Sequence, residues 1–297
     1  MSLQNVTIAG SGVLGSQIAF QTAFKGFNVT VYDINEDSIE TAKQRLTKLK
    51  EAFKHDLNAT DEQVQNTYDK ITFYTDLSNA VAKADIVIEA IPEVIDIKNK
   101  FYQQLSDVAP EHTIFASNSS TMLPSQLVGA TDRPEKFLML HFANEIWKNN
   151  TAEIMKHEHT DMAVFEQVVS FAEDIGMVAL PIYKEQPGYI LNSLLVPFLD
   201  AAEGLLVNEV ADVETIDKTW VIATGAPKGP FAILDVVGIR TPYNLALARA
   251  NAGDEVAGKI AKYLKTNYLD KGKLGIESGE GFYQYPNPAY VEKDFLK

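Results

Sequence analysis

The amino-acid sequence predicts an α/β domain with a doubly wound, mainly parallel sheet, followed by an all-α domain. Seven short runs of β-branched or apolar residues occur in the first part of the chain, and helical patterns separate several of them. Strands that alternate with helices of about ten or more residues are typical of βαβ units, whose strands lie parallel. After the turn signal Pro187-Gly188, nearly every stretch has the apolar spacing of a helix. We therefore predict two domains, residues 1–185 and residues 186–297.

The predicted strands and the helices between them follow from the spacing of apolar residues. Two helical patterns follow the first and second strands, from Ile18 to Phe24 and from Ile39 to Leu49. The seven strand runs are NVTIAG, NVTVYD, ITFYTD, DIVIEAI, TIFASN, FLMLHF and MVALPIY.

The composition favours a globular protein and excludes several classes of function. The 297 residues are 46% hydrophobic and 10% aromatic, which suits packed cores. The formal net charge of −14 argues against a general nucleic-acid or anionic-membrane surface, because both need positive potential. The chain has no cysteine, so it forms neither disulfides nor thiolate metal sites, and we predict no bound metal.

We interpret no segment as a targeting signal or a membrane span. MSLQNVTIAG runs directly into a strand pattern and lacks a basic region followed by an apolar one. The apolar stretch ILNSLLVPFLDAAEGLLV is interrupted by Pro197, Asp200 and Glu203, and it is too short and too charged to span a membrane. We expect a soluble, cytoplasmic protein.

The first predicted strand ends in a glycine pattern that indicates a dinucleotide site of the Rossmann type. In AGSGVLGSQIA the glycines have G-x-G-x-x-G spacing, a strand precedes them and a helix follows. Gly10 permits a tight turn, Gly12 lets the backbone approach a pyrophosphate, and Gly15 lets the helix pack against the strand. The predicted phosphate-binding loop consists of Gly10, Ser11, Gly12, Val13, Leu14 and Gly15.

Asp33, at the end of the second predicted strand, indicates which dinucleotide binds. Its carboxylate can accept hydrogen bonds from the adenosine ribose hydroxyls, and it would repel a 2′-phosphate. We therefore predict NAD rather than NADP. The alternative interpretation is a glycine turn that binds no nucleotide.

His141 and Glu153, in HFANEIWKNNTAEIM, are either an acid/base pair or two unrelated surface residues. Oxidation of a secondary alcohol needs a base for the hydroxyl proton, and histidine, with an ordinary pKa of about 6.5, can serve as base or acid near neutral pH. A carboxylate on the far ring nitrogen would fix the tautomer and stabilise the imidazolium. The other four histidines lie in polar contexts, and we expect His55, His112, His157 and His159 to be exposed.

Six motifs, in order along nearly the whole chain, give the sequence a family resemblance. ASNSST, HFANE, TAEIM, QPGYILNSLL, GAPKGPF and SGEGFYQY together resemble the NAD-dependent L-3-hydroxyacyl-CoA dehydrogenase family. GVLGSQIAFQTAF, HFANEIWKNNTAE and GAPKGPF resemble in particular a bacterial branch that includes diketoreductase, which acts on β,δ-dioxo esters. The set is specific, although no single motif is.

The resemblance implies roles for individual residues. It implies an acid/base pair of His141 and Glu153, together with a catalytic serine, Ser120, and a catalytic asparagine, Asn192. It implies NAD contacts at Glu93, Lys98 and Asn144. On the residues alone, Ser120 could instead be a helix N-cap or turn residue, and Asn192 could cap or bridge helices.

The sequence departs from the family pattern where the substrate is expected. Glu145 stands where the family has a proline after Asn144. The tract that follows contains Trp147, Lys148, Asn149 and Asn150 in place of the family's apolar residues. Glu277 stands where the family has a lysine that contacts the cofactor. Family CoA contacts lie after the second strand. The basic residues there could neutralise CoA phosphates or could form a solvated helix face; they are Lys43, Arg45, Lys48, Lys50 and Lys54.

These observations predict an oxidoreductase that interconverts 3-hydroxyacyl and 3-oxoacyl compounds, with a small-molecule substrate and a place in fatty acid metabolism. One alternative is a diketoreductase-like reductase of non-CoA 3-oxo or 3,5-dioxo esters. Another is a non-catalytic NAD-binding or crystallin-like structural protein. The extensive apolar run of the second domain also predicts a homodimer.

Overall fold

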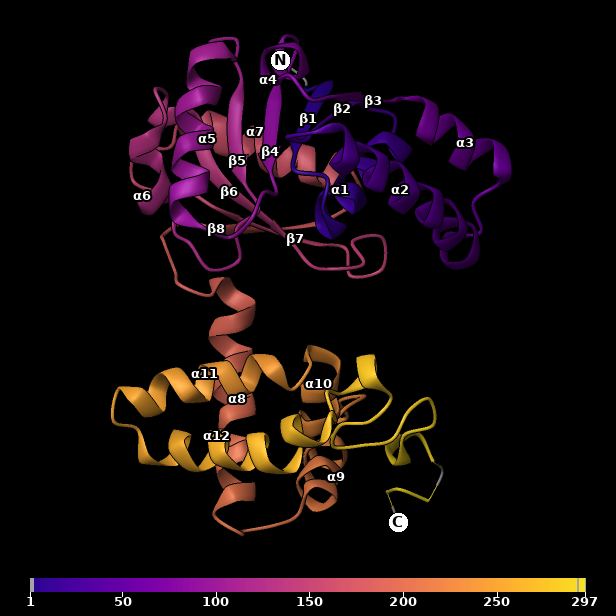
Figure 1. Ribbon diagram of the computed structural model, residues 1–297, viewed down its shortest axis with the longest axis vertical. Helices are drawn as coiled ribbons and strands as arrows, with labels where there is room; N and C mark the ends of the chain where they lie inside the picture. Colours follow the sequence, from indigo (N-terminus) through magenta and orange to yellow (C-terminus); the bar gives the residue numbers. More distant parts are fainter. Residues whose placement is uncertain (1–2, 293, 297) are drawn as a thin grey trace. The chain divides into compact units, whose positions relative to one another are not determined.

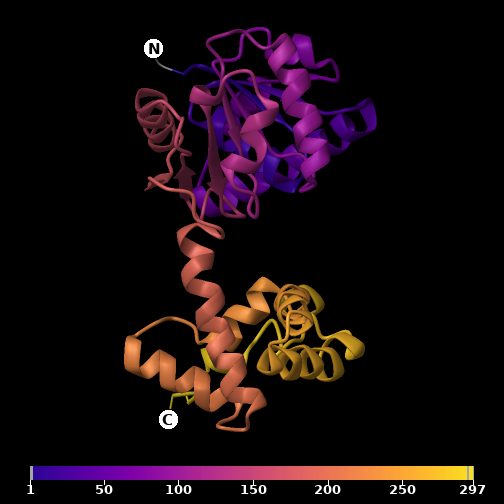
Figure 2. The ribbon, with the colours of Figure 1, turned by 90° about the vertical axis from the view of Figure 1, so that its left-hand side faces the viewer.

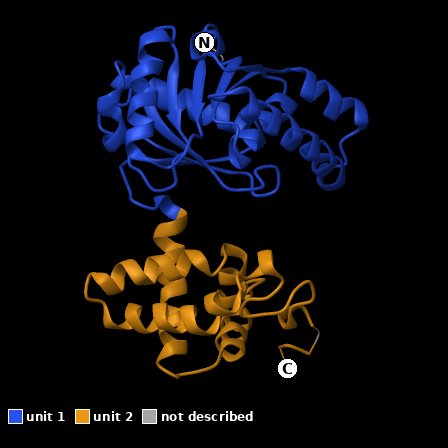
Figure 3. Cartoon of the chain, viewed as in Figure 1, with its two compact units in different colours: residues 1–190 blue, residues 191–297 orange. Residues whose placement is uncertain are grey.

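The computed structural model describes residues 3–292 and 294–296, and the chain divides into two compact units, residues 1–190 and 191–297 (Figure 3). The division falls a few residues after the boundary near residue 185 that the sequence pattern predicts. Unit 1 is a layered α/β structure and unit 2 is helical, so the predicted fold class is confirmed.

Unit 1 contains an eight-stranded sheet in the order β3-β2-β1-β4-β5-β6-β7-β8. Neighbouring strands are parallel except β6 and β7, which are antiparallel. The strands are β1 Asn5–Ala9, β2 Asn28–Tyr32, β3 Ile71–Tyr74, β4 Ile86–Glu89, β5 Ile114–Ser117, β6 Phe137–Phe142, β7 Thr151–Met155 and β8 Val178–Ile182.

Helices cover both faces of this sheet (Figures 1 and 2). Successive strand residues point to opposite faces, so the central strands are apolar at nearly every position. Along β6, Leu138 and Leu140 join the core cluster under α1, α2, α3 and α7, whereas Phe137 and Met139 join the cluster under α4, α5 and α6. The helices are α1 Val13–Phe24, α2 Glu36–Leu57, α3 Asp61–Asp69, α4 Leu77–Val81, α5 Ile95–Val108, α6 Pro124–Leu127 and α7 Met162–Asp174, with short 3-10 turns η1 Val128–Ala130 and η2 Pro134–Lys136.

Strand β7 is absent from the seven strands that the sequence predicts. It is only five residues long, and the polar side chains of Thr151 and Glu153 dilute its apolar signal. Its β conformation depends on pairing with β6 on one side and β8 on the other. Tertiary pairing, rather than local propensity, therefore makes this segment a strand.

Among its described residues, unit 2 has five α-helices and a C-terminal segment of short turns. Its core gathers apolar side chains of α8, α9 and α10 with aromatic residues of the C-terminal segment, including Tyr283 and Phe295. The helices are α8 Tyr189–Val207, α9 Val213–Thr224, α10 Pro230–Val237, α11 Arg240–Asn251 and α12 Glu255–Asn267, with 3-10 turns η3 Leu269–Lys271, η4 Ile276–Ser278 and η5 Ala289–Val291.

Helix α8 is the one helix in the described chain that could cross a membrane by length and composition. It is 19 residues long, its apolar stretch has a mean hydropathy of 1.6, and 17% of that stretch is buried. One side of it packs on protein, because Leu199 and Ala202 belong to the unit 2 core and Asp200 pairs with Arg249 of α11.

The expectation that four histidines are exposed is wrong for one of them. His157 is 4% exposed, and its Nε2 lies 2.9 Å from the carbonyl oxygen of Pro134. Burial lowers the pKa of His157 and so favours the neutral ring. The polar sequence around it gave no sign that its turn packs against the η2 segment. His55, His112 and His159 are exposed.

Glu203 is a buried carboxyl group in unit 2. It is 4% exposed, and within the described chain its Oε1 has no hydrogen-bond partner. Burial, with a further contribution from nearby Asp200, raises the pKa of Glu203 to about 8. The folded protein therefore holds this proton more tightly than the unfolded chain does. Its stabilising effect is fully present below the unfolded pKa of about 4.3 and is lost as the pH rises toward the folded value.

We predict that Glu203→Gln flattens the pH dependence of stability. Between about pH 4 and pH 8 the free energy of unfolding of the unmutated protein should fall by roughly 3–5 kcal/mol through this group. The variant lacks the ionisation and should lose less over the same range, as measured by urea unfolding at several pH values. Glu277→Gln, at an exposed position, is the control and should follow the unmutated protein. Parallel curves for both variants would contradict the assignment.

Candidate active site

The loop between β1 and α1 has the geometry that a dinucleotide requires. Gly10 has φ +97°, a backbone conformation that favours glycine, and a Cβ there would lie 2.5 Å from the carbonyl oxygen of Ala90. A Cβ at Gly15 would collide with the carbonyl oxygen of Gly10. Around Gly12 there is nothing within 4 Å of such an atom, so that side of the loop is open for a ligand. The backbone at Gly10 and Gly15 therefore has no room for a side chain, and the open side at Gly12 is compatible with the predicted approach of a pyrophosphate.

The first turn of α1 is available to bind phosphate. Gly12 is the N-cap and offers no side-chain acceptor, and no acidic residue lies in the first turn. The backbone N–H groups at Val13 and Leu14 therefore face the open side of the loop without a capping side chain. The residues present fit a pyrophosphate.

Asp33 is held at the edge of a cavity of about 990 Å³ that begins at this loop. Its Oδ2 accepts from the amide of Ser11 at 2.8 Å and from the Ser11 hydroxyl at 2.5 Å, while Oδ1 accepts from the amide of Ile34 at 2.8 Å. Arg45 lines the same cavity and donates to the carbonyl oxygen of Ser11 at 3.1 Å. The fixed carboxylate beside the glycine loop fits the ribose of an adenosine.

A second cavity, of about 230 Å³, extends from the same loop to Ser120. It shares Gly12, Ala90 and Ile91 with the first cavity. Its lining also contains Val13, Leu14, Gly15, Glu93, Lys98 and Thr121. All the predicted cofactor residues except Asn144, together with the predicted catalytic serine, therefore border these two adjoining cavities of unit 1.

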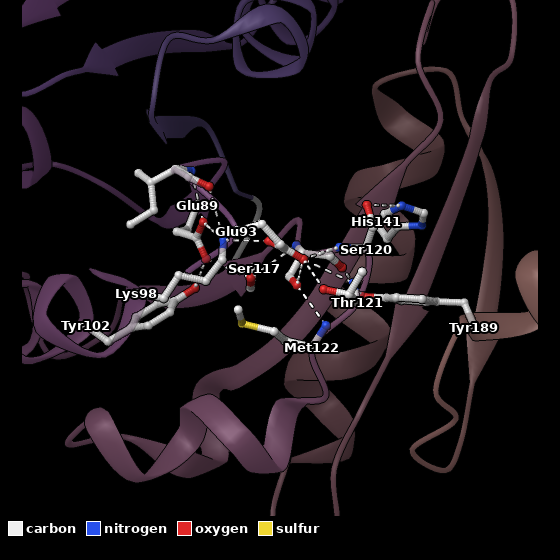
Figure 4. Close-up of polar contacts among 12 residues, drawn as sticks. Glu89, Glu93, Lys98, Tyr102, Ser117, Ser120, Thr121, Met122, His141 and Tyr189 are labelled. Carbon is white, nitrogen blue, oxygen red and sulfur yellow. Dashed lines mark hydrogen bonds and ion pairs between the residues drawn. The ribbon is translucent and has the colours of Figure 1, made fainter. Parts of the chain in front are cut away.

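His141 and Glu153 face each other across the antiparallel pair β6–β7. They are register partners, and His141 Nδ1 lies 3.2 Å from Glu153 Oε2. Ser120 Oγ lies 3.1 Å from His141 Nε2 (Figure 4). Glu153 is 4% exposed, and its other oxygen accepts from the amide of Ile190 at 2.9 Å. The structure thus brings three of the predicted catalytic residues into one hydrogen-bonded line.

The loop that carries Ser120 is fastened by Glu93. Its Oε1 accepts from the Ser119 hydroxyl, from the amide of Ser120 at 3.0 Å, and from the amide and hydroxyl of Thr121 at 3.1 and 2.8 Å (Figure 4). Partial burial opposes ionisation, but the hydrogen bonds from Ser119 and Thr121 outweigh it and lower the pKa of Glu93. Glu93 therefore acts as an anionic anchor for the serine loop.

Lys98 lies between two carboxylates beneath this loop. It is buried, pairs with Glu89, and lies 3.3 Å from Glu93 Oε2. Glu89 also accepts from the hydroxyls of Ser117 at 2.7 Å and Tyr102 at 3.2 Å. Glu89 is not among the site residues that the sequence predicts. Its only sign in the sequence is a carboxylate within the apolar run DIVIEAI, which needs buried partners if it is a strand.

Asn144 and Asn192 occupy different parts of the chain. Asn144 lies in the loop from β6 to β7, where its Oδ1 accepts from Gln17 Nε2 at 2.8 Å. Gln17 Oε1 in turn accepts from the amide of Glu145 at 2.8 Å, so this loop is tied to α1. Asn192 lies in the first turn of α8, within unit 2. Its catalytic role stays a prediction.

The tract that departs from the family pattern is attached to the end of α2. Trp147 Nε1 donates to Asp56 Oδ2 at 2.8 Å, and Lys148 Nζ lies 2.9 Å from the same oxygen. Hydrogen bonds from Trp147, His55 and Lys148 hold the pKa of Asp56 well below its usual range. This loop is therefore fixed to the end of α2 by an ion pair and by a hydrogen bond from the Trp147 indole N–H.

Three of the five basic residues of α2 have local partners, whereas Lys48 is exposed. Lys43 pairs with Glu40, Lys54 pairs with Glu51 and Asp61, and Lys50 donates to Gln65 at 3.0 Å. These contacts favour a solvated helix face for the three lysines. Arg45 faces the first cavity instead.

Both parts of the chain match models of one protein family. Residues 5–186 match the family model described as 3-hydroxyacyl-CoA dehydrogenase, NAD binding domain, and residues 188–285 match the model of the C-terminal domain of the same family. The chain belongs to the 3-hydroxyacyl-CoA dehydrogenase family. It is an NAD-dependent oxidoreductase, and the resemblance seen in its motifs is confirmed.

Several family members are similar over most of their length. The mitochondrial hydroxyacyl-coenzyme A dehydrogenase of Rattus norvegicus is 34% identical, with 95% of this chain and 91% of that protein covered. A probable 3-hydroxybutyryl-CoA dehydrogenase of Bacillus subtilis is 31% identical, with 96% and 98% covered. A solved structure of a diketoreductase, an enzyme with dual catalysis of dicarbonyl compounds, is 54% identical to this chain in sequence. The two structures superpose with a TM-score of 0.92, and the match covers 96% of this chain and 100% of the diketoreductase chain.

We predict that Asp33 sets the cofactor preference. Asp33→Ala should lower the NADH-over-NADPH ratio of kcat/KM by about 10- to 100-fold, because it removes charge-assisted bonds to the ribose and the repulsion of a 2′-phosphate. Asp37→Ala is the matched control, since Asp37 borders the same cavity without contacting Ser11. Steady-state rates with both cofactors decide the matter, and equal turnover of both by the unmutated protein would refute it.

Proposed function

We propose that the protein interconverts 3-hydroxyacyl and 3-oxoacyl compounds, with His141 as the acid/base group and Glu153 as its orienting carboxylate. The observation that supports this most strongly is the line from Ser120 through His141 to Glu153, next to the cavity lined by the glycine loop. A purely structural or NAD-sensing role gives no reason for these residues to align there.

The chemistry follows from what each residue can do with a proton. NAD supplies the hydride acceptor or donor. His141 Nε2 takes the hydroxyl proton in oxidation and returns a proton to the carbonyl oxygen in reduction. Glu153 at Nδ1 keeps the ring in the tautomer whose Nε2 is a base, and it stabilises the imidazolium that forms. Ser120 is close enough to the same nitrogen to hydrogen-bond the substrate oxygen beside it.

A second candidate is reduction of non-CoA 3-oxo or 3,5-dioxo esters. Two observations favour it, namely the 54% identity to a diketoreductase and the engagement of Lys43, Lys50 and Lys54 with local partners. If the substrate is a CoA thioester, residues other than these three lysines would have to bind the CoA phosphates. A role in fatty acid metabolism follows only if the substrates are CoA thioesters. The cytoplasmic location is a proposal that comes from the sequence alone.

We predict that the protein oxidises NADH when a 3-oxo substrate is present, and that this activity is lost when His141 is replaced. Acetoacetyl-CoA and ethyl acetoacetate, assayed separately, distinguish the two candidates. His141→Ala should lower kcat by roughly two to four orders of magnitude while NADH affinity, measured by fluorescence, barely changes. Reduction should be favoured at lower pH, because transfer of hydride to the carbonyl group also consumes a proton. Tight NADH binding without turnover of either substrate would instead support the non-catalytic alternative.

We also propose that the protein is a homodimer formed through unit 2. Large apolar side chains are exposed there, among them Leu194 at 69%, Ile222 at 62% and Val236 at 52%. We expect a partner to cover these side chains, because contiguous exposed apolar surface marks interaction sites and identical subunits most often pair about a twofold axis. Sedimentation velocity at micromolar concentration should give the mass of two chains. A single-chain mass would overturn the proposal.

A further inference from the structure

Tyr189, to which neither the sequence motifs nor the family model gives a role, contacts both His141 and the loop that carries Ser120. Its ring lies over the His141 ring, with the centroids 4.6 Å apart and the planes inclined by 28°. Its hydroxyl donates to the carbonyl oxygen of Ser119 at 2.6 Å. Figure 4 shows the ring beside His141 and the hydroxyl directed at the loop that holds Ser120. One side chain therefore joins the strand of the histidine to the loop of the serine.

The backbone next to Tyr189 completes the arrangement. Ile190, the following residue, donates its amide to Glu153 Oε1 at 2.9 Å. The first two residues of α8 thus contact the serine loop, the imidazole and the carboxylate. This one turn therefore holds together three separate segments of unit 1, namely β6, β7 and the loop after β5.

The conformation of Tyr189 indicates that its surroundings fix it firmly. Its φ is +57°, in the left-handed region that an aromatic residue rarely adopts, and the side chain is only 1% exposed. Burial, with the nearby carboxylates Glu153, Glu93 and Glu89, raises the pKa of Tyr189 far above its ordinary value. The hydroxyl is therefore always protonated and always able to donate to Ser119.

We propose that Tyr189 is a positioning residue for the acid/base reaction: its ring sets the plane of the His141 imidazole and its hydroxyl sets the position of the Ser119–Ser120 backbone. It acts through these groups and does not itself transfer a proton. The proposal rests on the proposed function, because positioning matters only if His141 and Ser120 do the chemistry. It predicts that the ring and the hydroxyl have separable effects.

The test compares three variants of the full-length protein. Tyr189→Phe keeps the ring and removes the bond to Ser119. Tyr189→Leu removes the ring and leaves an apolar side chain. Phe165→Leu is the matched control, because Phe165 is equally buried in unit 1 and contacts Tyr183 rather than the site. NADH affinity should stay within about twofold in all three, since neither Tyr189 nor Phe165 borders the cofactor cavities.

The first readout is spectroscopic and needs no turnover. The ring current of Tyr189 should displace the His141 ring-proton resonances upfield in a ¹H–¹³C spectrum, with the assignment made from His141→Ala. Tyr189→Phe and Phe165→Leu should keep this displacement, and Tyr189→Leu should abolish it. Unchanged His141 resonances in Tyr189→Leu would overturn the proposed stacking.

The second readout is kinetic, with NADH and whichever of acetoacetyl-CoA and ethyl acetoacetate is turned over. Tyr189→Leu should lower kcat about 10- to 100-fold with little change in KM, as expected for misplaced catalytic groups. Tyr189→Phe should lose less than about tenfold, the range for one hydrogen bond. Equal losses in Tyr189→Leu and Phe165→Leu would overturn the positioning role. If the unmutated protein turns over neither substrate, the proposed function fails, and the spectroscopic result alone decides the geometry.

Discussion

The antiparallel register of β6 and β7 is the constraint on which the site depends. It places His141 directly opposite Glu153, so that their side chains point to the same face of the sheet. A slip of one residue would send one of them to the opposite face, into the apolar cluster under α1 and α7. The flanking residues oppose such a slip, because Leu140 and Ile154 are buried on that other face. Packing of the core thus specifies the acid/base pair.

Two carboxylates, the buried Glu89 and the partly exposed Glu93, link this pair to the cofactor loop. Glu89 and Glu93 hold Lys98 between them, and Glu93 fastens the segment that carries Ser120. Removing one member of such a network would leave an uncompensated buried charge, which is costly, so its members fix one another. Ser11, Asp33 and the glycine loop lie just across the shared wall of Ala90 and Ile91. Cofactor and proton-transfer residues are therefore parts of one rigid assembly at the strand ends.

What the sequence could reveal depended on how local each signal is. The fingerprint glycines and Asp33 were predictable because a turn and a helix start are encoded in a few adjacent residues. The short strand β7, buried His157 and the network around Glu89 were not, because each depends on partners far along the chain. Tyr189 shows the same limit, since its contacts with Ser119 and His141 exist only once the fold has formed. For His141 and Glu153 the family resemblance supplied the pairing that the strand pattern did not.

The central claim is that His141 and Glu153 act as one unit in proton transfer. A double-mutant cycle with His141→Ala, Glu153→Gln and the combined variant measures this coupling through kcat for 3-oxo reduction. We predict that Glu153→Gln alone lowers kcat less than His141→Ala does. Once His141 is absent, Glu153→Gln should cost little more, so the two losses fall well short of adding. Losses that simply add, or near-normal turnover by His141→Ala, would contradict the account.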